Sequence, residues 1–129
     1  MREEARRLWL QALEDLETAR IMLETRRYYA SAFFSHQAAE KALKALFVHV
    51  KKEISPKTHN LLELLEHMGI EDEEIVDAAM ELNPEYVVSR YPDAANGVPA
   101  QMYNERIAKE RFEEARRIVE YCERRLQGQ

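Results

Sequence analysis

The segment from about residue 28 to residue 51 constrains the fold more than any other part of the chain. Its apolar side chains, among them Phe33, Leu43 and Phe47, cover most of the circumference of a helix instead of one stripe. A helix of that kind is packed on several sides in a folded protein. Alanines are frequent along it, so neighbouring backbones can approach closely. We therefore predict a central helix here, with the rest of the chain arranged around it.

Two further long helices are predicted, at about residues 3–26 and 104–126. In the first, apolar residues form one stripe and charged residues occupy the other side. The second has apolar residues at alternating spacings of four and three, which indicates a narrow seam shared by two long helices. Three aromatic residues of the helical segments are predicted to lie in the core: Trp9, Phe33 and Phe112.

Prolines and glycines divide the region between the central and the last helix. Pro56 ends the central pattern, and Thr58 is predicted to cap a third helix. Gly69 is a natural stop for that helix. The acidic run at residues 71–74 suits the positive N-terminal end of a fourth helix.

After the fourth helix, Asn83–Pro84 forces a stop or a kinked extra turn, and residues 91–102 form an irregular connection. Long loops in a compact domain are often functional. The chain has 129 residues, only three glycines and four prolines, and many residues of high helix propensity. We predict one domain over residues 1–129, an all-α, antiparallel up-and-down helical bundle of four to five helices.

The formal net charge of −5 gives the whole molecule no electrostatic attraction to a nucleic-acid backbone, so any such binding needs a local basic patch. The single cysteine, Cys122, cannot form an internal disulfide and is predicted to be a core or interface thiol. The charged N-terminus has no signal-peptide pattern, and no stretch has the length and apolarity of a membrane span. We expect a cytoplasmic protein.

Three blocks of sequence carry a resemblance to a known family. They are YASAFFSHQAAEKALKAL at residues 29–46, KTHNL at residues 57–61 and SRYPD at residues 89–93. In this order and spacing they resemble the HEPN family of prokaryotic and eukaryotic helical domains. The resemblance implies a helical bundle, usually a homodimer, often encoded beside a minimal nucleotidyltransferase as a toxin–antitoxin-like pair. A similar bundle forms the second domain of an antibiotic nucleotidyltransferase, where it helps to bind nucleotide.

Many HEPN proteins are metal-independent ribonucleases that carry an arginine followed, after four to six residues, by a histidine. Counted from Arg90, that histidine would stand at Ala95, Asn96 or Gly97, and no other arginine of the chain has a histidine at that spacing. Metal-free cleavage of RNA needs a group that exchanges protons near neutral pH, which is usually histidine. The missing signature disfavours a ribonuclease, although His59 could approach Arg90 in space.

The candidate ligand-binding residues are Arg90, Tyr91, Asp93 and Tyr103, with His59 at the start of the third helix. A guanidinium suits phosphate and a tyrosine ring suits stacking on a base. Two plainer interpretations stay open. Arg90 could pair with Asp93 to stiffen the turn, and the His59 ring could bond only to loop backbone.

Gln37, Glu40, Lys41 and Lys44 form one polar stripe on the otherwise apolar central helix. With its two lysines as donors, the stripe could contact phosphate or a partner. Alternatively it is a solvated face on which Glu40 and Lys44 pair four residues apart. Burial of this stripe in a groove would favour a specific role, because charged groups are rarely buried without a partner.

We expect neither a metal site nor a cofactor, because no two histidines stand three or four residues apart and no cysteine cluster accompanies them. Two hypotheses follow. The first is a homodimeric binding module for a nucleotide or a nucleotidyltransferase partner. The second is a metal-independent ribonuclease using Arg90 with His59 or Tyr91. A module that only mediates assembly is a third, plainer possibility.

Overall fold

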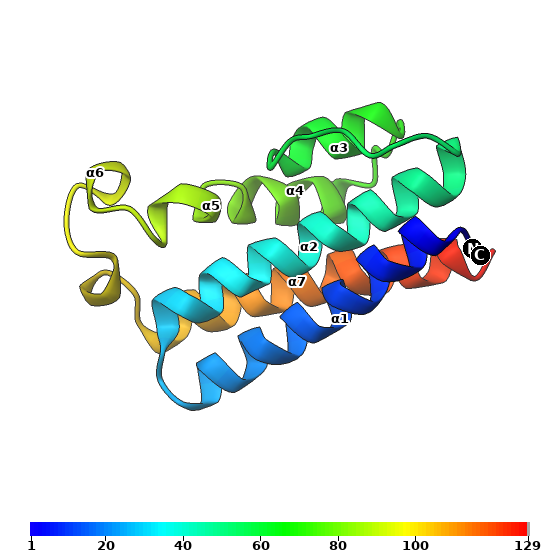
Figure 1. Ribbon diagram of the computed structural model, residues 1–129. Coiled ribbons are helices and arrows are strands. Elements are labelled where there is room, and N and C mark those ends of the chain that lie inside the picture. The colour runs from blue at the N-terminus through cyan, green and yellow to red at the C-terminus, as the bar shows by residue number, and fades with distance from the viewer. Residues whose placement is uncertain (129) are drawn as a thin grey trace.

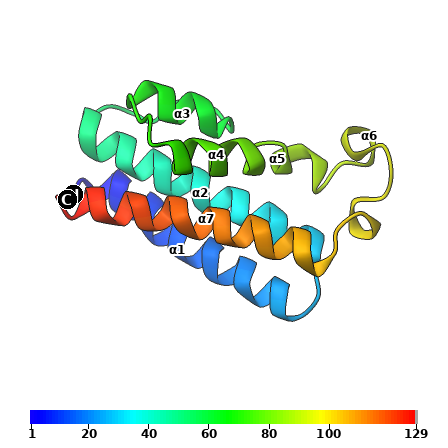
Figure 2. The ribbon, with the colours of Figure 1, turned by 180° about the vertical axis from the view of Figure 1, so that it is seen from behind.

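The computed structural model describes residues 1–128, and every regular element in that range is helical (Figure 1). Three long helices form its body: α1 (Glu3–Glu24), α2 (Tyr28–Lys51) and α7 (Glu105–Leu126). α1 runs antiparallel to α2 and α7, and both termini lie at the same end of the bundle (Figures 1 and 2). The prediction of an all-α helical bundle is confirmed, and the bounds of the three long helices agree with the sequence patterns.

α2 is the central helix, as its pattern predicts, and it packs against both α1 and α7. Alanines make much of this contact. Those that are fully buried include Ala12 and Ala19 on α1, Ala38, Ala39 and Ala42 on α2, and Ala108 and Ala115 on α7. Because the alanine side chain is only a methyl group, the helix backbones can lie close together. Protein interiors are packed as densely as organic crystals, so a larger side chain at these positions has little room.

Two shorter helices, α3 (Leu61–His67) and α4 (Glu73–Leu82), cover the remaining side of α2 (Figure 1). Their leucines and isoleucine complete the core, with Leu61, Leu64, Leu65, Ile75 and Leu82 all buried. Gly69 ends α3 with φ +64°, as predicted, and Asp72 caps α4 by accepting a hydrogen bond from the Ile75 backbone N–H.

The predicted cap of α3 is wrong by two residues. Asn60, not Thr58, is the cap, since its side-chain oxygen accepts from the backbone N–H groups of Leu62 and Glu63. The Thr58 hydroxyl instead accepts from the Asn60 N–H. Asn83 stabilises Asn60 as the cap through two hydrogen bonds. Asn83 Nδ2 donates to Asn60 Oδ1 at 3.0 Å, and Asn83 Oδ1 accepts from the backbone N–H of Leu61 at 2.8 Å. The end of α4 is thereby tied to the start of α3.

Beyond Asn83 the chain leaves the end of the bundle and returns (Figures 1 and 2). This excursion holds the single turns α5 (Glu85–Val88) and α6 (Pro92–Ala95) and a 3₁₀ turn at Pro99–Gln101. The kinked turn predicted after Pro84 is α5. The irregular connection predicted at residues 91–102 contains α6 and the 3₁₀ turn.

Cys122 is fully buried, in agreement with its prediction as a core thiol, and burial raises the pKa of that thiol. Of the three predicted core aromatics, Trp9 packs against the core cluster but is itself only partly buried, and Phe33 and Phe112 are also only partly buried. Phe33 lies against the Arg90 guanidinium. Within residues 1–128, no helix combines the length and apolarity needed to cross a membrane.

The alanine contacts give a first testable expectation. Ala12→Leu places a larger side chain where α1 packs on α2, so it should lower the free energy of unfolding by about 1–3 kcal/mol through overpacking. Urea denaturation monitored by circular dichroism measures the change. Glu14→Leu, on the exposed face of the same helix, is the matched control and should alter stability by no more than about 0.5 kcal/mol. Equal stability of Ala12→Leu and wild type would contradict the close approach of the two helices.

Candidate functional site

Arg90 lies at the end of α5 with its guanidinium surrounded by aromatic rings. The guanidinium carbon is 4.5 Å from the ring centroids of Phe33 and Tyr86 and 4.8 Å from that of Tyr91. Nε donates to the Tyr86 carbonyl oxygen at 2.8 Å. Within residues 1–128, no carboxylate forms an ion pair with Arg90, so the alternative of an Arg90–Asp93 pair is not what the structure shows. The rings and the carbonyl fix the guanidinium without neutralising it.

Tyr86 connects Arg90 to His59. The rings of His59 and Tyr86 are stacked, with centroids 3.9 Å apart and planes 13° from parallel. His59 precedes α3, and Tyr86 follows α4, so this contact joins two segments that are distant in sequence. The structure thus brings Arg90, Tyr91 and His59 of the predicted site together, with Tyr86 between the histidine and the arginine.

A buried carboxylate holds the His59 side chain. Glu40 is 5% exposed, and its Oε1 accepts a hydrogen bond from His59 Nδ1 at 2.9 Å. Its other oxygen accepts from Lys44 Nζ at 3.1 Å. With Nδ1 donating to the carboxylate, Nε2 is the ring nitrogen left for other partners, and half of the His59 side chain is exposed. His59 therefore has the arrangement of a histidine oriented by an acidic residue.

His36 fixes the backbone of the same segment. Its fully buried ring donates from Nε2 to the His59 carbonyl oxygen at 3.0 Å and accepts from Gln37 Nε2 at its Nδ1, at 3.3 Å. Burial lowers the pKa of His36 to about 4, a larger effect than the opposing influence of Glu40. At neutral pH the ring is therefore uncharged, which is the protonation state that both of its hydrogen bonds require.

The predicted polar stripe of α2 is an internal network and not a solvated face. Lys41 Nζ lies 2.7 Å from Asp15 Oδ2 and donates to Gln37 Oε1 at 3.1 Å. The pairing of Glu40 with Lys44 is present as predicted, but it is buried. Both lysines are held by carboxylates of the same chain, so in this structure their charges are balanced and turned inward.

Within residues 1–128, Tyr103 and Asp93 make no hydrogen bond or ion pair with Arg90 or His59. The Tyr103 hydroxyl donates to Glu85 Oε1 at 2.6 Å, so it is engaged with a neighbouring element and not with the Arg90 surface. Asp93 is an exposed residue of α6, and Tyr91, immediately before that helix, is 51% exposed.

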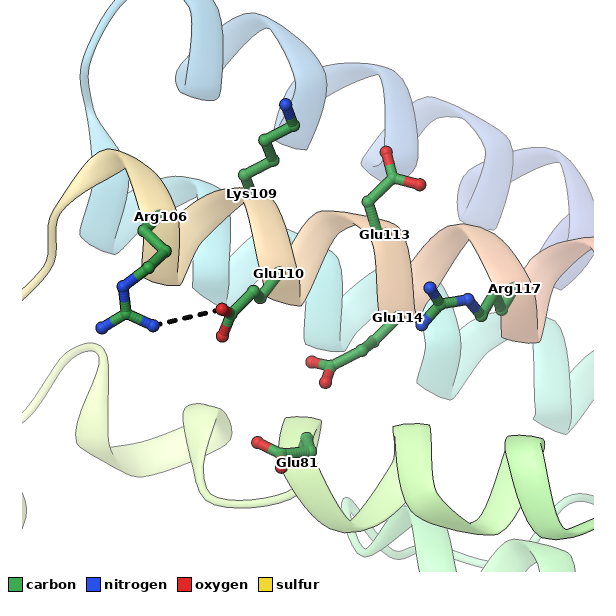
Figure 3. Close-up of a pocket in the computed structure, with 7 residues that line it drawn as sticks. All are labelled: Glu81, Arg106, Lys109, Glu110, Glu113, Glu114 and Arg117. Carbon is green, nitrogen blue, oxygen red and sulfur yellow. Dashed lines mark hydrogen bonds and ion pairs between the residues drawn. The ribbon is translucent and has the colours of Figure 1, made fainter.

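A groove with a volume of about 330 Å³ runs between α4 and α7 (Figure 3). None of the predicted site residues lines it. Its side chains are of both signs, and one pair of them, Arg106 and Glu110, is in contact at 3.1 Å. Exposed pairs of this kind, four residues apart, are common on solvated helices and contribute little. The groove is lined by Glu81, Arg106, Lys109, Glu110, Glu113, Glu114 and Arg117.

Sequence reasoning missed Tyr86 and His36 and assigned Phe33 to the core. One signal was available for Tyr86, because it stands four residues before Arg90 and so falls on the same side of a helical turn. His36 had no comparable signal, since a histidine on an apolar helix carries no mark of its partner. Within residues 1–128, no group of three or more potential metal ligands is clustered.

Comparison with known proteins places these features in context. The HEPN domain family model matches residues 5–125. The crystal structure of a protein from Thermus thermophilus has a TM-score of 0.86 and 32% identity, with 95% of this chain and 98% of that chain covered. A structure described as an archaeal HEPN homologue has a TM-score of 0.83 and 32% identity, covering 97% of this chain and 99% of the other. A protein of Methanocaldococcus jannaschii named "Putative toxin" is 29% identical, over 84% of this chain and 79% of its own.

The low pKa of His36 predicts a pH dependence of stability. The unfolded chain takes up a proton near pH 6.5, whereas the native protein resists protonation until about pH 4. Stability contributed by neutral His36 is therefore present above pH 6.5 and is lost as the pH falls toward 4, by up to roughly 3 kcal/mol. Urea denaturation at several pH values measures this loss.

The comparison protein for that experiment is His36→Gln, whose amide can donate to the His59 carbonyl without titrating. Burial raises the pKa of Glu85 and of Glu114, which acts in the opposite direction but equally in both proteins. The difference between wild type and variant should therefore shrink as the pH falls. An NMR titration of the wild-type His36 ring is an independent measure, and a midpoint near 6.5 would contradict the assignment.

Proposed function

This chain belongs to the HEPN family, and on that premise we propose that it binds a nucleotide at the surface made by Arg90, Tyr86, Tyr91 and His59. We propose further that it acts as the HEPN member of a toxin–antitoxin-like pair with a minimal nucleotidyltransferase. The single observation that supports the binding proposal best is the unneutralised guanidinium of Arg90 among three aromatic rings.

Phosphate is the ligand group that suits this guanidinium. The guanidinium lies over the Tyr86 ring, and its Nε donates to the Tyr86 carbonyl oxygen. The N–H groups of its two terminal nitrogens are therefore the donors left for a ligand. Charge-assisted hydrogen bonds from arginine to phosphate are strong and directional. Arg90 is also pre-positioned, so little side-chain entropy is lost when the ligand arrives.

The base and sugar of a nucleotide have candidate partners beside Arg90. Tyr91 exposes half of its surface, so a base can stack on it, and such stacking tolerates any base because each has a π face. The exposed carboxylate of Asp93 can accept hydrogen bonds from ribose hydroxyls. Gln37, Lys41 and Lys44 have internal partners, so direct phosphate contact by them would require those pairs to open.

Two features support the proposal of a partner chain. The excursion beyond the bundle exposes Val87, Val98 and Met102, in addition to Tyr91, and exposed apolar groups near a site often mark a protein contact. The relative from Methanocaldococcus jannaschii bears a name that assigns it provisionally as a toxin. The homodimer that the sequence resemblance implies belongs to the same proposal.

A ribonuclease is the second candidate, and the pairing of Glu40 with His59 is the observation that favours it. A buried carboxylate on Nδ1 orients the ring and leaves Nε2 directed away from Glu40, which is how general acid–base histidines are positioned. Arg90 lies across Tyr86 from this ring and can stabilise charge on a phosphate. In this mechanism His59 takes the place of the histidine missing from residues 95–97.

Isothermal titration calorimetry with ATP tests the binding proposal. Arg90→Ala should weaken the affinity at least about tenfold, because hydrogen bonds to charged groups contribute about 1.5–3 kcal/mol. Arg125→Ala is the matched control, since Arg125 also lies over a tyrosine ring, that of Tyr121, but at the far end of α7. Equal heats from wild type and Arg90→Ala, or no heat from either, would remove the nucleotide proposal.

Incubation of RNA with purified protein in excess EDTA tests the second candidate. Cleavage should occur in wild type and fall by about 10²-fold or more in His59→Asn, because general acid–base catalysis contributes about 10²–10⁴-fold. Asparagine keeps a donor for Glu40 but cannot exchange a proton at neutral pH. His67→Asn, on the exposed end of α3, is the control. Absent cleavage, or cleavage that persists in His59→Asn, would end the ribonuclease hypothesis.

A further inference from the structure

Glu85 and Tyr103 lie at the two ends of the excursion that carries Arg90. Glu85 is the first residue of α5, and Tyr103 precedes the Asn104 cap of α7. The Tyr103 hydroxyl donates to Glu85 Oε1 at 2.6 Å, across a sequence separation of 18 residues. This single hydrogen bond closes the intervening chain into a ring.

The Glu85 carboxylate is also anchored to α7. It is 5% exposed, and its Oε2 lies 3.5 Å from Arg111 Nε. Arg111 in turn pairs through Nη1 with Glu81 of α4 at 3.1 Å and with Glu114 of its own helix at 2.9 Å. One arginine therefore holds three carboxylates that belong to α4, α5 and α7.

The anchored residue is adjacent to the groups that hold Arg90. The Glu85 backbone carbonyl accepts from the Ser89 hydroxyl, and the next carbonyl, that of Tyr86, accepts from Arg90 Nε. Any movement of α5 at Glu85 therefore displaces the carbonyl and the ring that fix the guanidinium. Burying a carboxylate is costly and gives little net stability. The buried Glu85 carboxylate therefore serves mainly to favour the one arrangement of α5 in which it has its partners.

We propose that Glu85 and Tyr103 form a latch that ties together the two ends of the 89–102 segment beside α7 and thereby positions Arg90 for its ligand. Both are positioning residues, since neither contacts the Arg90 surface directly through its polar group. The inference rests on the proposed function for the identity of the ligand, but the latch itself can be observed without any ligand.

Tyr103→Phe is the sharpest variant, because it removes only the hydroxyl and keeps the ring. Amide hydrogen exchange should accelerate by about tenfold or more at residues 87–102 and stay unchanged in α2, since local opening is separable from global unfolding. ATP affinity should fall by about tenfold. Tyr29→Phe is the matched control, because within residues 1–128 the Tyr29 hydroxyl bonds only to the exposed Arg27, and it should change neither quantity.

A conservative substitution of Glu85 tests whether the hydrogen bond to Tyr103, and not only the volume of the side chain, holds the segment. Glu85→Gln keeps an oxygen that can accept from Tyr103, so it should retain most of the protection and affinity, whereas Glu85→Leu should lose both. Unchanged exchange in Tyr103→Phe would overturn the latch, as would equal acceleration throughout α2 and α7. Faster exchange with unchanged ATP affinity would overturn the positioning role.

The latch and the proposed function can fail independently. Where wild type binds no ATP, the NMR signal of the Arg90 Nε–H reports its position, because three neighbouring rings shift it strongly. That signal should move toward the position of a free arginine in Tyr103→Phe and stay in place in Tyr29→Phe. An Arg90 signal that is the same in all three proteins would overturn the inference.

Discussion

The arrangement of this protein depends on the burial of α2 on nearly all sides. A helix so enclosed needs internal partners for the charged groups that it buries, because unpaired buried charge is costly. Glu40 is the decisive case, since its carboxylate is paired with Lys44 of α2 and with His59 from the start of α3. His36 adds a second bond from α2 to the same segment. The packing requirement of the core thus determines where His59 lies, and through the stacked Tyr86 ring it also determines where Arg90 can lie.

The charges of the molecule divide into those that are balanced internally and those that are not. Lys41 is paired with Asp15, and Arg111 with three glutamates. Arg90 differs, because within residues 1–128 it contacts rings and one carbonyl but no carboxylate. In a chain with a net charge of −5, Arg90 is thus a fixed positive charge with no carboxylate partner among the described residues.

Periodicity and helix breakers predict the helices of this chain because both are local properties of the sequence. The three long helices, the stop at Gly69 and the turn after Pro84 all follow from patterns within a few residues. The site depends on contacts across the chain, which local patterns do not contain. Both Thr58 and Asn60 can cap a helix, and Asn83 from the end of α4 decides between them. The spacing of Glu40, Lys41 and Lys44 predicts the polar stripe on α2. Its burial depends on the segment that contains His59, which packs against α2 and which no local pattern predicts.

The segment from Pro92 to Gln101 extends beyond the end of the bundle, and its α6 contributes no residue to the core cluster. Insertions, deletions and substitutions there should consequently be tolerated by the scaffold while they reshape the surroundings of Arg90. Changes confined to this excursion would alter the surface around Arg90 while leaving the alanine-lined helices as they are. Divergence of function in such a domain would be concentrated in about a dozen residues that contribute little to whether it folds.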